Sequence, residues 1–143
     1  MAEQLDNNPF IGTWQLVSFE MSTPGGTVSP FGRDPAGYFV FSPDGYASVN
    51  IMPAGRTKTA SENPFFATDE EKIANAFFLS YAGRYEVKDD VLAVYPDVSY
   101  FPNWVGVPQI RNFRMEGDIL VLSQRGDFIG TPELEVVLRW KRP

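Results

Sequence analysis

YAGRYEVKDDVLAVYPDVS, residues 81–99, is the part of the sequence with the clearest pattern. Over residues 81–87 the side chains alternate in character with a period of two, which is typical of a half-buried β-strand. Lys88, Asp89 and Asp90 form a polar turn, and residues 91–99 return as a second strand. The segment therefore predicts an antiparallel hairpin with one face turned toward a core.

The rest of the chain is divided in the same way into short apolar runs and turn signals. Ser42-Pro43-Asp44-Gly45 predicts a second hairpin, because proline presets φ at the first turn position and glycine accepts a positive φ. The predicted strands cover residues 13–20, 37–41, 46–52, 81–87, 91–99, 109–115, 119–124 and 134–140. About eight strands at this spacing indicate an all-β barrel or sandwich. The even run of hairpins favours an antiparallel up-and-down barrel, which at eight strands is just wide enough to hold one small ligand.

One short helix is predicted between the third and fourth of these strands. Thr68 and Glu71 form a capping box, which marks a helix N-terminus. Ile73 and Phe77 are spaced as an i, i+4 apolar pair, so we expect about three turns. Phe77 and Phe78 are expected to seat this helix against the barrel.

Length and composition exclude several classes of protein. The 143 residues predict one domain, residues 1–143, long enough to bury about two thirds of the unfolded surface without a metal or disulfide. The net charge of −6 argues against nucleic acid as a partner, because an acidic surface repels phosphates. The chain has no cysteine and no histidine, which excludes Ser-His-Asp and Cys-His triads and His-ligated zinc or haem.

Motifs for cofactors and membranes are also missing from the sequence. It contains no GxGxxG, P-loop, GxSxG or calcium-loop pattern, so we expect neither a cofactor nor a metal. The first ten residues do not form a secretory signal, and no stretch approaches the roughly 20 apolar residues of a membrane span. We expect a cytoplasmic monomer or small homo-oligomer without membrane insertion.

Six blocks in order along the chain resemble the bacterial and fungal lipocalin-like domain proteins. They are GTWQLVSFE at 12–20, PDG with SV at 43–49, YAGRYEV at 81–87, PNWVG at 102–106, Gln109 with Arg111, and LRW at 138–140. The first block opens with a motif similar to the G-x-W of lipocalins and other calycins. The resemblance implies a calycin-type barrel with a cavity for a small, mostly apolar molecule, and related small barrels act as cyclases or isomerases. Relatives often place a histidine on the strand matching residues 91–99, where this chain has Val94 and Tyr95, so a mechanism through that histidine does not transfer.

The hairpin at residues 81–99 supplies the first candidate site residues. If residues 88–90 form a three-residue loop, Val87 lies opposite Val91 and Tyr81 lies opposite Asp97. The residues then expected to face inward are Tyr81, Gly83, Tyr85, Val87, Val91, Ala93, Tyr95, Asp97 and Ser99. A slip of one residue would exchange the two faces.

A second candidate lies on the strand at residues 109–115. Arg111, Phe113 and Met115 share a face, and the apolar members indicate that it points inward. An inward arginine must meet an anion, because an unpaired buried charge is very costly. Two interpretations remain open: Arg111 locks the barrel through Asp97 or the indole of Trp14, or it anchors a ligand carboxylate or carbonyl.

Aromatic residues on the loop before this strand are candidates for ligand contact. Asn103 and Trp104 lie where recognition residues often lie, and Trp104 either covers the barrel mouth or packs under the loop. Trp14 and Trp140 are expected in the core at the closed end.

Two functions fit these residues. In the first, the barrel encloses a small apolar molecule and isomerises, dehydrates or cyclises it without a cofactor: Asp97 acts as base or acid, and Tyr81 or Arg111 stabilises an enolate-like charge. The expected ligand contacts are Tyr85, Tyr95, Phe113, Trp104, Asn103 and Ser99. In the second, the same barrel is a passive carrier. A barrel without a cavity that binds a partner is a third possibility. The sequence leans slightly to the catalyst, because a passive carrier has less need of an inward ionisable pair.

Overall fold

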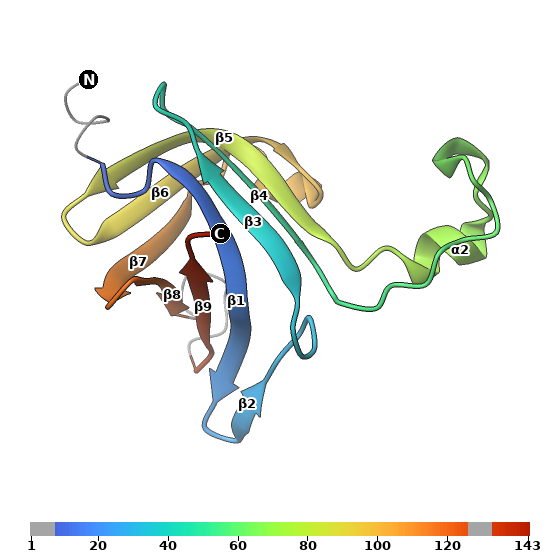
Figure 1. Cartoon of the computed structure of the whole chain (residues 1–143), viewed down its shortest axis with the longest axis horizontal. Coiled ribbons are helices and arrows are strands. Elements are labelled where there is room, and N and C mark those ends of the chain that lie inside the picture. The colour runs from blue at the N-terminus through green and yellow to red at the C-terminus, as the bar shows by residue number, and fades with distance from the viewer. Residues whose placement is uncertain (1–7, 126–132) are drawn as a thin grey trace.

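In the part of the chain that the structure describes, nine antiparallel strands form one sheet that closes into a barrel (Figure 1). The computed structural model describes residues 8–125 and 133–143. The strands are β1 (Gly12–Thr23), β2 (Gly26–Val28), β3 (Ala36–Phe41), β4 (Tyr46–Met52), β5 (Leu79–Lys88), β6 (Val91–Ser99), β7 (Gln109–Glu116), β8 (Ile119–Arg125) and β9 (Glu135–Lys141). The sheet runs in chain order from β3 to β9, and β1 pairs with both β3 and β9 to close it. Because β2 only extends β1 in a hairpin, the predicted eight-stranded up-and-down barrel is confirmed, with one extra strand.

The inner face of the barrel follows from alternation along the strands. In β3 and β4 every second residue is buried, which places Phe39, Phe41, Val49 and Ile51 inside. The residues between them point to the opposite face, because successive side chains of a strand alternate. Phe39 and Phe41 stack with their ring centroids 4.4 Å apart. The core is therefore rich in aromatic rings.

One end of the barrel is closed by the segment that precedes β1. The indole Nε1 of Trp14 donates a hydrogen bond to the carbonyl of Phe10 at 3.0 Å. Phe10 is fully buried, and its ring lies 5.0 Å from that of Phe41 and 4.8 Å from that of Phe113. The guanidinium of Arg142 lies 3.8 Å from the centroid of the Trp14 ring. The expected position of Trp14 at the closed end is confirmed.

The β5–β6 hairpin has a different register from the predicted one. Lys88 pairs with Val91, so the turn contains two residues, Asp89 and Asp90, and Asp89 has a φ of 55°. A left-handed φ is tolerated by aspartate better than by most residues, which makes the tight turn possible. The prediction that Val87 lies opposite Val91 is wrong, because Val87 pairs with Leu92. The β6 strand is therefore shifted by one residue.

The segment between β4 and β5 leaves the barrel and contains the helix α2 (Asp69–Ala74), as Figure 1 shows on the right. The predicted capping box is confirmed: Thr68 Oγ1 accepts from the amide of Glu71, whose side chain accepts from the amide of Thr68. The expected three turns are wrong, because the helix ends at Ala74. Ile73 is 76% exposed, so no apolar face of α2 packs on the barrel. Short 3₁₀ turns lie in two of the connections: η1 (Pro64–Phe66) precedes α2, and η2 (Pro102–Trp104) lies between β6 and β7.

Candidate functional site

A cavity of about 270 Å³ lies inside the half of the barrel away from Phe10. Strands β1, β3, β4, β5, β7, β8 and β9 and the connections around its mouth contribute side chains to its wall. The lining residues are Phe19, Met21, Pro30, Phe31, Phe39, Val49, Ile51, Phe77, Leu79, Tyr81, Tyr100, Trp104, Arg111, Leu122, Gln124, Val136, Leu138 and Trp140. Most of them are apolar or aromatic, which is typical of a site for a small organic molecule.

Aromatic side chains surround the mouth of this cavity. Trp104, from η2, makes edge-to-face contacts with Tyr81, Tyr100 and Phe101, with ring centroids 5.6 to 5.9 Å apart. The expectation that Trp104 covers the barrel mouth is consistent with this position in the cavity wall. Asn103, on the same turn, is exposed and is not among the lining residues.

A second aromatic pair lines the cavity from the other connections. Phe31, between β2 and β3, stacks on Phe77, just before β5, with ring centroids 4.4 Å apart and planes 12° from parallel. Phe77 lines the cavity, but it lies after the end of α2, so it is not part of the helix that it was expected to seat against the barrel. Phe78 instead lies beneath the guanidinium of Arg56, 5.5 Å from it.

Tyr81 and Arg111 are both in the cavity wall, as expected. Arg111 pairs across the β6–β7 ladder with Leu92, which is fully buried, so the two side chains point to the inside. Burial raises the pKa of the Tyr81 hydroxyl, and the positive charge of Arg111 acts in the opposite direction. One Arg111 nitrogen donates to the carbonyl of Ile110 at 2.9 Å. Within residues 8–125 and 133–143, Arg111 has no carboxylate partner.

Asp97 does not point into the barrel, and that prediction is wrong. Its side chain is exposed, and it lies at the register shift of the β5–β6 ladder, where Ala82 pairs with Val98 and Gly83 with Pro96. The turn is one residue shorter than predicted, and this shift exchanges the two faces of β6. Val94 and Pro96 are therefore buried, whereas Asp97 is exposed. The Asp97 carboxyl therefore lacks the low-dielectric surroundings that a base inside the cavity requires.

The predicted register also placed Tyr95 inside the barrel. This prediction is wrong, because Tyr95 lies on the outer face. It is 37% exposed, and its hydroxyl donates to the carboxylate of Glu86 on the outer face at 3.2 Å. Ser99 lies opposite Tyr81 because the bulge restores the register, but its hydroxyl accepts from the amide of Phe101 and it is not a lining residue. Tyr95 and Ser99 are thus not positioned as ligand contacts in this cavity.

Tyr85 and Phe113 are inside the barrel, but at its closed end. Tyr85 is buried against Phe41 and donates from its hydroxyl to the carbonyl of Ser42 at 3.0 Å. Phe113 packs on Phe10. The prediction of their inward direction is confirmed, whereas neither lines the cavity. Met115, expected on the same face as Phe113, is exposed at the end of β7.

Trp140 and Gln124 are cavity residues that the sequence pattern did not identify. Trp140 was predicted as core at the closed end; it is fully buried but also lines the cavity. Its indole N–H has no hydrogen-bond partner among the described residues. Gln124 is buried and lines the same wall. Gln124 continues the period-two series of Leu120 and Leu122 on the inner face of β8, and that spacing was the signal available for it.

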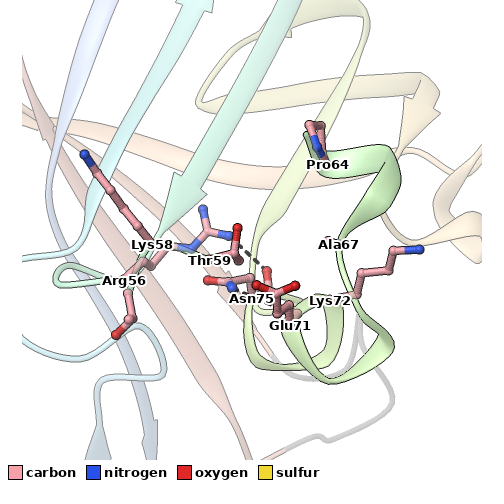
Figure 2. Close-up of a pocket in the computed structure, with 9 residues that line it drawn as sticks. Arg56, Lys58, Thr59, Pro64, Ala67, Glu71, Lys72 and Asn75 are labelled. Atoms are coloured by element: carbon pink, nitrogen blue, oxygen red, sulfur yellow. Dashed lines mark hydrogen bonds between the residues drawn. The ribbon is translucent and has the colours of Figure 1, made fainter. Parts of the chain in front are cut away.

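A larger, open hollow of about 460 Å³ lies outside the barrel, against α2 (Figure 2). The side chain of Glu71 accepts hydrogen bonds from the amides of Ala60 and Thr68 and from the hydroxyl of Ser61. These hydrogen bonds lower the pKa of Glu71 to about 2. Arg56 donates to the carbonyl of Asn75 at 3.0 Å. Because these polar groups bind one another, we interpret the hollow as part of the loop's own structure.

Other site types were searched in the part of the chain that the structure describes. No group of three acidic, histidine or cysteine side chains is placed to hold a metal in residues 8–125 and 133–143. Across the same residues, none of the helices has the length and apolarity needed to cross a bilayer.

The sequence of the whole barrel identifies its family. Residues 11–143 match the family described as a lipocalin-like domain. The chain belongs to the lipocalin-like domain family. The resemblance drawn from the six sequence blocks is thereby confirmed.

Two known proteins are similar to this lipocalin-like barrel. The 4'-hydroxy-3'-methoxypropiophenone carrier protein ppsC of Aspergillus oryzae is 34% identical over 85 residues, which cover 53% of this chain and 77% of that protein. The crystal structure of an uncharacterized protein from Bacteroides eggerthii aligns over 91% of this chain and 98% of its own, with 15% identity and a TM-score of 0.46. That structural likeness is too distant to support an argument about function.

Proposed function

We propose that this lipocalin-like protein is a carrier that encloses one small, largely apolar molecule and releases it unchanged. The observation behind the proposal is the cavity of about 270 Å³, walled mostly by apolar and aromatic side chains and bordered by Trp104. Ligand pockets are usually lined in this way, with few polar groups. The closed end of the barrel is filled by Phe10, so the mouth near Trp104 is the expected route of entry.

The volume favours a ligand with one ring. The cavity lies just below the range of about 300–1,000 Å³ that is usual for drug-sized ligands. The aromatic wall contributed by Phe39, Tyr81 and Trp140 suits a flat molecule, because rings pack edge-to-face or offset. The name of the Aspergillus oryzae relative describes a carrier of 4'-hydroxy-3'-methoxypropiophenone, a single-ring aryl ketone. That name supports an aryl ketone as the first ligand to test.

Catalysis has less support than carriage. The catalytic hypothesis required Asp97 in the cavity, and Asp97 is on the outside. No aspartate or glutamate of the described residues lines the cavity, so Tyr81 and Arg111 have no carboxylate base beside them there. The homologous carrier also favours the passive function.

The proposal is tested by titrating the full chain with 4'-hydroxy-3'-methoxypropiophenone while following tryptophan fluorescence, and by recovering the ligand for mass and chromatographic analysis. We expect saturable quenching and a chemically unchanged ligand, since Trp104 and Trp140 line the cavity. Val49→Phe should fill the cavity and abolish binding, whereas Val40→Phe, on the outer face of β3, should not. Failure of a panel of single-ring ketones to bind, or recovery of an isomerised or cyclised product, would overturn the carrier function.

A further inference from the structure

The cavity wall contains one formal charge, and it is positive. Among the described lining residues, Arg111 is the only acidic or basic side chain. An arginine presents five N–H donors and no acceptor. One of them is used by the carbonyl of Ile110, and no carboxylate of residues 8–125 and 133–143 lies within salt-bridge distance of Arg111. The remaining donors have no acceptor among the described residues, and Arg111 lines the cavity, so these donors are available to a ligand there.

The two structural interpretations of Arg111 are not supported by the geometry. Asp97, one predicted partner, is exposed on the outer face of the barrel. Trp14, the other, is already covered by Arg142 at the closed end. The inward position of Arg111 therefore has no protein anion to explain it within the described part of the chain. An uncompensated charge in a partly buried site is costly unless a ligand offsets it.

A neutral donor and an aromatic ring share the wall with this charge. The side chain of Tyr81 is buried, its hydroxyl makes no hydrogen bond to a described residue, and the positive charge of Arg111 opposes the effect of burial on its pKa. The Tyr81 hydroxyl is therefore a second donor available to a ligand beside Arg111. The indole N–H of Trp140 also lacks a partner among the described residues, but it has no accessible surface, so a ligand contacts the ring of Trp140 and not its N–H.

We propose that the preferred ligand is an aromatic oxyanion, a carboxylate or a phenolate, whose negative oxygen binds Arg111 while its ring packs against the ring of Trp140 in the aromatic wall. This inference rests on the proposed function, since it requires that the cavity takes a ligand, and it adds the charge that the ligand bears. Arginine suits this role because its planar fork matches a carboxylate.

The charge preference is tested with hydrocinnamate and hydrocinnamamide, which have the same ring and nearly the same shape. By calorimetric titration of the full chain, the carboxylate should bind about ten- to a hundredfold more tightly than the amide, as expected for a charge-assisted hydrogen bond. Arg111→Gln should remove this preference by weakening only the carboxylate. Arg114→Gln is the matched control, because Arg114 lies on the same strand and pairs with Glu116 on the outside. Arg111→Lys, which retains the charge, should keep part of the preference.

The indole donors provide a second measurement that needs no substitution. The chain has three tryptophans, so three indole N–H signals are expected in a ¹⁵N-correlated NMR spectrum. Binding of hydrocinnamate should shift the Trp140 signal, because the ligand ring packs against the Trp140 indole in the cavity wall. The Trp14 signal should stay in place, since its N–H already binds the carbonyl of Phe10.

The outcomes separate the inference from the function on which it rests. If the amide binds and the carboxylate binds no better, or if Arg111→Gln weakens both equally, the oxyanion preference is wrong and the carrier function stands. If neither probe nor any neutral ketone binds, both are wrong. A Trp140 signal that does not move when hydrocinnamate saturates the protein would contradict the part assigned to Trp140.

Discussion

The guanidinium of Arg142 lies 3.8 Å from the centroid of the Trp14 ring and joins the end of the chain to the closed end of the barrel. The same side chain donates to the carbonyls of Thr13 at 3.1 Å and Pro9 at 3.0 Å. Arg142→Ala should lower the free energy of unfolding by about 1–2 kcal/mol, because a cation–π contact and two hydrogen bonds are lost. Urea denaturation measures the loss, with the exposed neighbour Lys141→Ala as control. Equal stability of the two variants would show that this contact is not stabilising.

Gly83 is required by the bulge in the β5–β6 ladder. A Cβ at this position would overlap the carbonyl oxygen of Tyr95, which belongs to the backbone and cannot rotate away. Gly83→Ala should therefore destabilise the protein by about 2–3 kcal/mol, as expected for strong overpacking. Gly25→Ala should have little effect, because its Cβ would meet only Thr23 Oγ1 at 3.6 Å. Thermal unfolding of the two variants compares them, and an unchanged melting temperature for Gly83→Ala would mean that the bulge is absent.

The segment around α2 should loosen in acid. The pKa of Glu71 is lowered from 4.5 to about 2 by hydrogen bonds from Thr68, Ser61 and Ala60. Because the folded-state pKa is the lower one, the stabilisation is complete above about pH 4.5 and is lost as the pH falls toward 2. The protection of the amides of Ala60 and Thr68 against hydrogen exchange, corrected for the intrinsic pH dependence of exchange, should fall over this interval.

Glu71→Gln should reproduce the acid effect at neutral pH, since the amide cannot accept as many hydrogen bonds as the carboxylate. Glu70→Gln is the control, because Glu70 lies on the exposed side of the same turn. Exchange rates near Ala60 that are the same in both variants would contradict the assigned network.

Trp104 should slow the release of a ligand from the cavity. Its ring covers Tyr81 and contacts Tyr100 and Phe101 at the mouth. Trp104→Ala should increase the dissociation rate and weaken binding about tenfold, since several aromatic contacts are lost. Stopped-flow displacement of a bound aryl ketone gives the rate. Phe65→Ala is the control, because Phe65 is 87% exposed and is not a lining residue; an equal effect of both substitutions would exclude the proposed cover.

The architecture was predictable from the sequence because alternation and turn residues act locally. The two-residue period in β3, β4 and β5 places alternate side chains on one face whatever the partner strand is. The capping box at Thr68 and the turn at Pro43 likewise depend on a few neighbouring residues. Most neighbouring strands are joined by short connections, which fixes their order, whereas β4 and β5 pair across the long segment of residues 53–78.

The candidate site was predicted only in part, because register depends on a turn length that the sequence left open. Lys88, Asp89 and Asp90 fit a loop of two or three residues, and the choice between them moves Tyr95 and Asp97 to the opposite face. The direction of Arg111 did not depend on that turn. Phe113, two residues further along the same strand, is apolar and shares its face, which predicted that Arg111 points inward. Trp140 was recognised as core, but its contact with a void depends on the packing of the whole barrel.

A crystal structure of the complete chain with a bound single-ring ketone or hydrocinnamate would test whether the hollow interior is the binding site. The account predicts density for the ligand ring between Phe39, Val49 and Trp140, beneath Trp104. Density for the ligand in the open hollow beside Arg56 and Glu71, with the interior of the barrel filled by repacked side chains, would contradict it.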